Sequence, residues 1–216
     1  MQLDEVRPYW EGLWKKRRQL FLKRVFDLFA SIILLIILAI PMLIISILIK
    51  KEDSGPIFYC QERITTYGKH FRIHKFRTMV VNADQYGATV TVREDPRVTR
   101  VGKKLRSLKL DELPQLLDVI VGDMSLVGTR PEAVKYVELY KPEYNATLLL
   151  PAGITSEASI RYKNEAELLD AVSDVDKVYM EKVLPEKMKW NLESIRKFCL
   201  LREFITMFRT VFSMFG

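Results

Sequence analysis

Two adjacent carboxylates, Asp111 and Glu112, are the residues of this chain best suited to chemistry. They open a stretch with a helical pattern, and acidic side chains at a helix start often only stabilise the helix dipole. Three arginines from separate segments, Arg77, Arg106 and Arg130, weaken that structural interpretation, because a helix start together with guanidinium groups suits a phosphate. Two interpretations stay open from the residues alone: a helix cap, and a carboxylate site that handles a phosphate.

The segments around this pair predict a compact mixed domain. Residues 56–63 and 71–76 alternate between apolar and polar side chains across a short turn, which predicts a β-hairpin. Gly122 has the position of a glycine that ends a helix. Helical patterns are found at residues 98–108, 111–122, 131–144 and 165–183.

An uncharged apolar run of 22 residues, 28–49, is the strongest feature of the N-terminal part. As a helix it would be about 33 Å long, enough to cross a bilayer core. Lys and Arg flank it on both sides, whereas a simple spanning helix collects them on one side. Pro41 removes a backbone donor inside the run and predicts a bend. A re-entrant helix–break–helix and a kinked spanning helix are both compatible with this pattern.

Amphipathic segments flank the apolar run and close the chain. Residues 9–22 mix tryptophan and leucine with a Lys/Arg cluster, which suits a lipid headgroup layer or a partner helix. Residues 201–216 carry phenylalanine and other apolar residues at helical spacing, with Arg202 and Arg209 on the other face. That helix either packs on the domain core or lies at the membrane interface.

Composition excludes several classes of protein. The 216 residues include 49% hydrophobic and 28% charged residues, which excludes a disordered chain. Two cysteines exclude a disulfide framework, and two histidines make a histidine-based metal site or triad a poor explanation. The net charge of +7 alone suggests nucleic acid, but the basic residues cluster beside the apolar run, so no nucleic-acid partner is expected.

Motifs in a fixed order run through most of the chain. They are Lys23-Arg-Val-Phe-Asp27, Ser54-Gly-Pro56, Gln61-Glu-Arg63, Lys75-Phe-Arg-Thr-Met79, Asp95-Pro-Arg-Val-Thr99, Leu110-Asp-Glu-Leu-Pro-Gln115, Gly122-Asp-Met-Ser-Leu-Val-Gly128, Arg130-Pro-Glu132 and Pro151-Ala-Gly-Ile-Thr155. In these motifs, from about residue 21 to 212, the chain resembles the bacterial sugar transferases, the monotopic phosphoglycosyl transferases that begin surface-glycan assembly.

The resemblance implies a reaction. A sugar 1-phosphate passes from a UDP-sugar to undecaprenyl phosphate, and UMP is released. Asp111 would attack the sugar-proximal phosphate and form a covalent aspartyl phosphosugar, which the lipid phosphate then attacks. The resemblance also implies Mg²⁺, with Glu112 and Asp111 as its protein ligands.

Further residues receive roles only through the resemblance. Arg106 and Arg130 would hold the diphosphate, with Lys75 and Arg77 as weaker candidates. The family also implies the re-entrant form of the membrane helix, broken at Pro41, and a catalytic domain on the cytoplasmic face of the bacterial inner membrane. An anchor of this shallow kind would hold the site at the depth of the lipid phosphate.

The chain departs from the family pattern at several positions. Ile40, Asp118, Thr129 and the segment 156–165 differ from the usual residues. The altered segment lies where nucleotide-sugar recognition is expected, and Arg161 and Lys163 are candidates to replace a family arginine there. Asp176 is the candidate match for an acidic residue near the family's active site.

The sequence thus predicts an α+β fold: a mostly helical membrane-associated domain with a small β-hairpin, a re-entrant membrane helix and interfacial amphipathic helices. Its expected parts are a basic amphipathic segment (1–22), the membrane helix (23–50), a catalytic domain (51–200) and a C-terminal amphipathic helix (201–216). The partners expected are the UDP-sugar, undecaprenyl phosphate and membrane lipids, and a homodimer stays open. The alternative function is an inactive membrane scaffold for a glycan assembly complex, which would have lost the carboxylate pair or the arginines.

Overall fold

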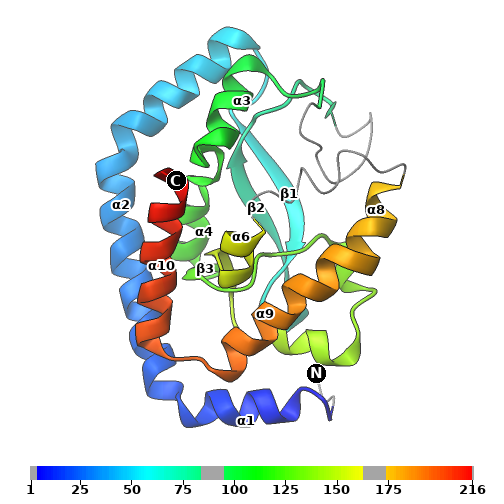
Figure 1. Ribbon diagram of the computed structural model, residues 1–216. Helices are drawn as coiled ribbons and strands as arrows, with labels where there is room; N and C mark the ends of the chain where they lie inside the picture. Colours follow the sequence, from blue (N-terminus) through cyan, green and yellow to red (C-terminus); the bar gives the residue numbers. More distant parts are fainter. Residues whose placement is uncertain (1–3, 84–94, 163–173, 216) are drawn as a thin grey trace.

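The computed structural model describes residues 4–83, 95–162 and 174–215, and these form a mostly helical structure with two small sheets (Figure 1). The α-helices are α1 (Arg7–Lys15), α2 (Arg17–Glu52), α3 (Arg100–Ser107), α4 (Gln115–Val121), α5 (Val134–Val137), α6 (Glu157–Arg161), α8 (Val175–Val178), α9 (Leu184–Arg196) and α10 (Leu200–Phe215). The strands are β1 (Phe58–Ile64), β2 (His70–Phe76), β3 (Met124–Val127) and β4 (Ala152–Thr155). Short 3-10 turns are η1 (Thr66–Gly68), η3 (Leu110–Glu112) and η4 (Pro142–Leu149), and η5 (Tyr179–Val183) is a π-helical turn.

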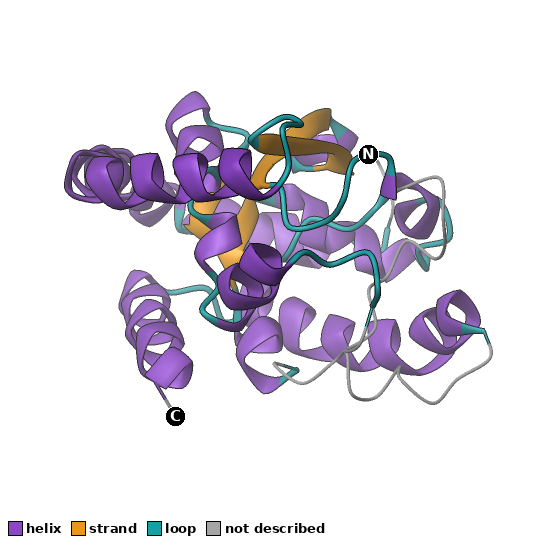
Figure 2. Cartoon of the chain, turned by 90° about the horizontal axis from the view of Figure 1, so that it is seen from above, coloured by secondary structure: helices purple, strands orange, loops and turns teal. Residues whose placement is uncertain are grey.

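Helix α2 is the apolar run together with both of its basic flanks. It continues through Pro41 as one helix, starts at Arg17 rather than at residue 23, and ends at Glu52. Figure 1 shows it rising along one side of the molecule and then bending over the top, and Figure 2 shows the lower part nearly end-on beside the upper part. The bend expected at a proline is therefore present, but the predicted break in the helix is not. Within the described residues, α2 alone is long and apolar enough to cross a membrane.

One face of α2 packs on the domain and the other is exposed. Apolar side chains of its first half, such as Phe26 and Leu38, pack against a core cluster formed by β2, α4, β3 and β4. Ile45 and Ile49 of its second half are buried against Phe76 and Leu105. Large apolar side chains cover the opposite face, with more than half of Ile36, Ile37, Ile40 and Leu43 exposed. An exposed aliphatic surface of this extent suits lipid rather than water.

The predicted hairpin is confirmed. Strands β1 and β2 pair antiparallel from Phe58 opposite Phe76 to Ile64 opposite His70. The helix predicted at residues 98–108 is confirmed as α3, and Gly122 ends α4 with a φ of 104°, as expected for a C-terminal glycine. The expected helix at 111–122 is a 3-10 turn, η3, followed by α4.

One expectation needs correction, and one pair of strands was not predicted. Residues 131–144 contain only the four-residue helix α5 and the start of η4, rather than one helix. A parallel pair, β3 with β4, was not predicted, because each strand has only four residues and its partner lies far along the chain. Much of the predicted helix at 165–183 lies outside the described residues.

The C-terminal helix α10 packs on the domain with one face and exposes an apolar stripe on the other. One face docks through Thr210, which hydrogen-bonds Thr155 of β4 at 2.7 Å, and through Phe204, which packs edge-on against Phe26 of α2 at 4.6 Å. The other face exposes a stripe of apolar side chains: Leu201, Ile205, Phe208, Val211 and Phe212. This arrangement is typical of a helix lying in a membrane interface.

Helix α1 has a similar two-faced character. Tyr9 and Leu13 are buried in a core cluster with residues of α9 and η4. Trp10 and Trp14 lie outside this cluster, are about half exposed and stack on each other at 5.4 Å. Tryptophan pairs with one apolar and one polar edge are enriched at lipid headgroup depth.

Gly102 of α3 offers a test of how tightly α3 is seated. A Cβ at this position would lie 2.1 Å from the backbone oxygen of Thr78, so alanine cannot fit without moving the helix. We expect Gly102→Ala to lower the free energy of unfolding by about 1–3 kcal/mol, measured by thermal or denaturant unfolding in detergent. Gly12→Ala on α1 is the control, since nothing lies within 4 Å of its Cβ, and it should not destabilise. Equal free energies of unfolding for the two variants would contradict the close packing of α3.

Candidate active site

Asp111 lies in the turn between α3 and α4. Lys109, two residues earlier, adopts a left-handed conformation with a φ of 55°, which reverses the chain and starts η3. A left-handed non-glycine residue is a strained element of the kind found at functional sites. Asp111 is buried, and its Oδ1 atom has no hydrogen-bond partner. A buried carboxylate oxygen without a partner is costly, so this atom is expected to meet a ligand.

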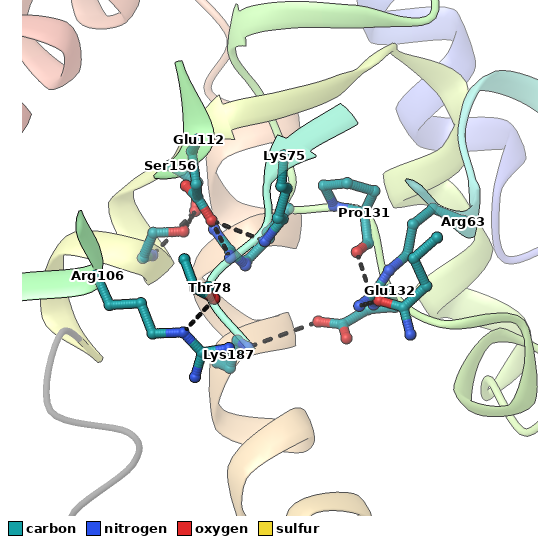
Figure 3. Close-up of polar contacts among 12 residues, drawn as sticks. Arg63, Lys75, Thr78, Arg106, Glu112, Pro131, Glu132, Ser156 and Lys187 are labelled. Carbon is teal, nitrogen blue, oxygen red and sulfur yellow. Dashed lines mark hydrogen bonds and ion pairs between the residues drawn. The ribbon is translucent and has the colours of Figure 1, made fainter. Parts of the chain in front are cut away.

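Glu112, in contrast, is paired with two cations. Lys75 Nζ on β2 donates to Glu112 Oε1 at 3.0 Å. Arg130 Nη2 donates to the same oxygen at 2.5 Å, and Arg130 Nη1 donates to Oε2 at 3.3 Å. Burial raises the pKa of Glu112, but the charges and hydrogen bonds of Arg130 and Lys75 outweigh it and hold the pKa well below its usual range. Glu112 is therefore the anionic centre that gathers the cations (Figure 3).

The environment acts differently on Asp111. Burial, and then the charge of Glu112, raise its pKa, while Lys75, Arg106 and Arg130 act in the opposite direction. Arg106 comes from the last turn of α3, and its Nε donates to Thr78 Oγ1 at 2.8 Å. Two adjacent carboxylates with pKa values displaced in opposite directions are a signature of a functional site.

Two contacts fix the elements that carry these groups. Asp118 of α4 accepts a hydrogen bond from the backbone N–H of His74 at 2.9 Å, and its other oxygen contacts His74 Nδ1 at 2.6 Å. His74 precedes Lys75, so this pair sets Lys75 on β2 against the helix that follows Glu112. Thr78 follows β2, and its backbone oxygen accepts from Thr99 N–H at 3.0 Å, next to the start of α3.

Helix α2 contacts both helices that flank Asp111, α4 near its own N-terminus and α3 at its C-terminus. Arg24 donates to the backbone oxygens of Val119 and Ile120 at 2.6 and 3.0 Å, which satisfies the C-terminal end of α4. Glu52, the last residue of α2, accepts from the first backbone N–H groups of α3, with Arg100 N at 2.8 Å. Helix α2 thus fixes where α3 and α4 lie, and with them Arg106 and Asp111.

A buried polar cluster joins the same helix to the sheet and to α10. Lys23 pairs with Asp27 at 3.1 Å and with Glu203 of α10 at 3.2 Å. Ser125 on β3 donates to Asp27 at 2.7 Å and accepts from Lys23 at 2.6 Å. The motif Lys23-Arg-Val-Phe-Asp27 therefore has a structural explanation.

Arg77 is placed differently from the other predicted phosphate ligands. Its Nη2 donates to the backbone oxygen of Asp53 at 3.0 Å, and its Nη1 lies 3.4 Å from the Asp53 carboxylate. Gly55 lies against it, and a Cβ there would lie 1.8 Å from Arg77 Nη1, so a larger residue would displace the guanidinium. The contacts of Arg77 thus join β2 to the residue after α2, and among the described residues they are made with Asp53 rather than with Asp111 or Glu112.

Arg161 and Asp176, two candidates for substrate binding, make their described contacts away from the carboxylate pair. Arg161 on α6 pairs with Glu157 at 3.0 Å and stacks over Trp190 at 3.7 Å. Asp176 on α8 pairs with Lys135 at 2.6 Å and accepts from the hydroxyl of Tyr136 at 2.5 Å, and these partners lower its pKa. Lys163 lies outside the described residues.

A second buried polar group beside Arg130 received no role from the sequence. Arg63 of β1 donates to the backbone oxygen of Pro131 at 3.3 Å, and Lys187 of α9 lies 3.5 Å from Glu132. Lys187 and Glu132 are both buried. The motif around Glu132 was visible, but the burial of Lys187 follows from how α9 packs, which local patterns do not reveal.

Comparison with known proteins adds the family. The family described as bacterial sugar transferase matches residues 18–216. A Bacillus subtilis protein provisionally named as an undecaprenyl-phosphate N-acetylgalactosaminyl 1-phosphate transferase is 42% identical over 155 residues, which cover 71% of this chain and 84% of that protein. The UDP-N-acetylgalactosamine-undecaprenyl-phosphate N-acetylgalactosaminephosphotransferase of Aeromonas hydrophila is 39% identical over 153 residues, 69% of this chain and 36% of that protein.

A third relative matches more of the chain. The UDP-glucose:undecaprenyl-phosphate glucose-1-phosphate transferase of Escherichia coli is 33% identical over 198 residues, 90% of this chain. The matched part is 40% of the Escherichia coli protein, so the chain spans well under half the length of two of these three relatives. The match to the family covers the carboxylate pair and its cations, and this chain belongs to the bacterial sugar transferase family.

Proposed function

We propose that this enzyme transfers a sugar 1-phosphate from a UDP-sugar to undecaprenyl phosphate, releases UMP and so begins the assembly of a surface polysaccharide. The relatives whose names state this acceptor support the substrate class. The observation that carries the proposal is the buried Asp111, whose Oδ1 has no hydrogen-bond partner, beside a carboxylate that gathers Lys75 and Arg130.

The proposed route is a double displacement at the sugar-proximal phosphorus. An oxygen of Asp111 forms a bond to this phosphorus while the bond to the bridging oxygen of UMP breaks, and UMP leaves with the electron pair. An oxygen of the lipid phosphate then attacks the same phosphorus, and Asp111 leaves as a free carboxylate. Splitting the transfer lets two bulky anionic substrates use one site in turn.

The charge of the site supports a diphosphate as its ligand. Five cationic side chains (Lys75, Arg106, Arg130, Arg63 and Lys187) gather around three carboxylates (Asp111, Glu112 and Glu132). Among these described residues two positive charges are in excess, which matches the charge of a bound diphosphate. Burial lowers the pKa of Lys75, and an incoming dianion would act in the opposite direction and favour its charged form.

A magnesium ion fits the donor set of this site. Mg²⁺ takes one or two carboxylates and completes its shell with phosphate oxygens and water. Asp111 offers a buried oxygen without a partner, and Glu112 is its neighbour, so these two residues would hold the ion. When bound, the ion neutralises charge on the transferred phosphoryl group. The protein cations Arg106 and Arg130 would orient the diphosphate beside it.

We propose that α2 is re-entrant and that the catalytic domain faces the cytoplasm at the inner membrane. The bend after the middle of α2 and the basic residues at both of its ends support this topology. The exposed apolar faces of α10 and α1 would then lie in the headgroup layer with the lipid substrate.

The topology predicts the labelling of two exposed positions, one at each end of α2. In a background in which Cys60 and Cys199 are serine, we expect Arg18→Cys and Lys51→Cys both to resist a membrane-impermeant thiol reagent in intact spheroplasts. Both should react after the membrane is permeabilised. Labelling of one of the two from outside would show a spanning helix instead.

A panel of UDP-sugars tests the function. The purified protein in nanodiscs would be incubated with each donor, Mg²⁺ and undecaprenyl phosphate, and UMP release measured. Release from one donor that is lost on chelation of Mg²⁺ would support the transferase and name its sugar. No release from any donor by folded protein would favour the alternative of an inactive scaffold.

A further inference from the structure

We propose that Arg63 and Lys187 are positioning residues that clamp the turn 130–132 from two sides and so aim Arg130 at Glu112. The inference rests on the proposed function, because the two residues would hold in place the guanidinium of Arg130 that binds the phosphate. It assigns positioning roles to Arg63 of the motif Gln61-Glu-Arg63 and to Glu132 of the motif Arg130-Pro-Glu132, which take no step in the proposed transfer.

The turn needs such support because it lacks regular structure. Residues 129–133 lie between β3 and α5 and belong to neither a helix nor a strand. The backbone oxygen of Thr129 accepts from Gly153 N–H at 2.8 Å, which holds the start of the turn to β4. Beyond that point, the position of Arg130 depends on contacts made by side chains.

Arg63 holds the turn from the side of the hairpin. Its Nη1 donates to the backbone oxygen of Pro131, the residue after Arg130, at 3.3 Å. Its Nη2 donates to Gln61 Oε1 at 2.5 Å, so the two polar residues of the motif brace each other on the same strand. Arg63 and Arg130 lie close enough for their positive charges to repel each other. The hydrogen bond from Arg63 to Pro131 therefore holds the turn near β1 against this repulsion.

Lys187 holds the turn from the side of α9. Its Nζ lies 3.5 Å from the carboxylate of Glu132 and 3.0 Å from the hydroxyl of Tyr179. Both members of the Lys187–Glu132 pair are more than nine-tenths buried, and removing one member of a buried pair is far more costly than removing an exposed one. Figure 3 shows the contacts of Arg63 with Pro131 and of Lys187 with Glu132 converging on this turn, beside the contact of Lys75 with Glu112.

A double-mutant cycle between Arg63 and Arg130 tests the clamp. We would measure kcat and KM for UMP release by the wild type, Arg63→Met, Arg130→Met and the double variant, in nanodiscs. If Arg63 acts through Arg130, Arg63→Met lowers kcat/KM about tenfold in the wild type and by less than about twofold in the Arg130→Met background. Arg63→Lys should restore part of the activity, because it keeps a cationic donor near Pro131.

The control is Arg72→Met, an exposed arginine on β2 opposite Glu62 in the same hairpin. It should leave kcat/KM unchanged in both backgrounds. Equal losses from Arg63→Met in the two backgrounds would show an effect independent of Arg130 and would overturn the clamp.

A binding measurement keeps the inference independent of turnover. The dissociation constant of UDP would be measured by calorimetry for the same four proteins, with the same non-additive pattern expected. The contact of Lys187 with Glu132 is tested by a double variant that carries both Lys187→Gln and Glu132→Gln. Replacing both residues leaves no unpaired buried charge, so this variant should fold. It should still bind UDP more weakly than the wild type. Unchanged UDP binding would overturn this half of the clamp. Failure of the wild type both to bind UDP and to release UMP would instead overturn the proposed function.

Discussion

Asp111→Asn is expected to abolish UMP release, with a loss of about 10³-fold or more in kcat. Asparagine keeps the size and the buried position but removes the anionic oxygen that would attack phosphorus. The variant should remain folded, because Asp111 Oδ1 makes no hydrogen bond that the substitution would break. The measurement is UMP release with the donor that the wild type accepts.

Asp123→Asn is the matched control for this substitution. Asp123 follows α4, and its carboxylate pairs with the exposed Lys69 at 2.6 Å. Its replacement should change kcat less than twofold, because exposed ion pairs contribute little. Release that survives Asp111→Asn would remove the covalent role of Asp111 while leaving the class of reaction standing.

Arg130→Met should have the second largest effect, a loss of about 10²-fold in kcat/KM. Two consequences combine in this variant. The diphosphate loses a guanidinium that holds it, and Glu112 loses the donor that contacts both of its oxygens. With that partner gone, the pKa of Glu112 rises towards its usual range, since Arg130 contributes the largest of the effects that lower it.

Arg130→Lys distinguishes charge from geometry. Lysine keeps the charge but lacks the planar fork that reaches two carboxylate oxygens at once, so it should recover only a small part of the activity. Recovery to near the wild-type rate would show that Arg130 acts as a point charge, and a loss smaller than about threefold in Arg130→Met would remove it from the site.

The local parts of the fold were predictable because short-range patterns encode them. Three elements could be predicted from a few neighbouring residues each. Alternation across residues 56–76 predicts the hairpin, Gly122 predicts the end of α4, and the spacing of apolar residues predicts α10. The parallel pair β3–β4 and the short helix α5 were not predictable, because four-residue elements take their stability from distant partners rather than from their own sequence. The continuity of α2 through Pro41 was also not predictable from local sequence, because neighbouring elements pack against the bent helix and support it.

The candidate site was also only partly predictable from the sequence. Family motifs pointed to Asp111, Glu112, Lys75, Arg106 and Arg130, and the structure groups them. Arg77 belonged to the same motif as Lys75, but strand residues two apart face the same side only while the strand continues, and β2 ends at Phe76. Arg77 therefore contacts Asp53 instead.

The fold also links helix α2 directly to the carboxylate pair. Arg24 near the start of α2 satisfies the end of α4, and Glu52 at its end receives the first N–H groups of α3. Asp111 lies in the turn between these two helices. In the proposed topology, the depth of α2 in the membrane would therefore set the depth of Asp111, which would meet the lipid phosphate at the headgroup layer.

The most direct test of this account is to incubate the protein with its UDP-sugar and Mg²⁺ in the absence of any lipid acceptor. We predict a burst of UMP that approaches one equivalent per protein, together with the mass of a phosphosugar on the peptide that contains Asp111. Subsequent addition of undecaprenyl phosphate should remove that mass. UMP release that requires the acceptor, with no added mass on Asp111, would contradict the covalent route and point to direct attack by the lipid phosphate.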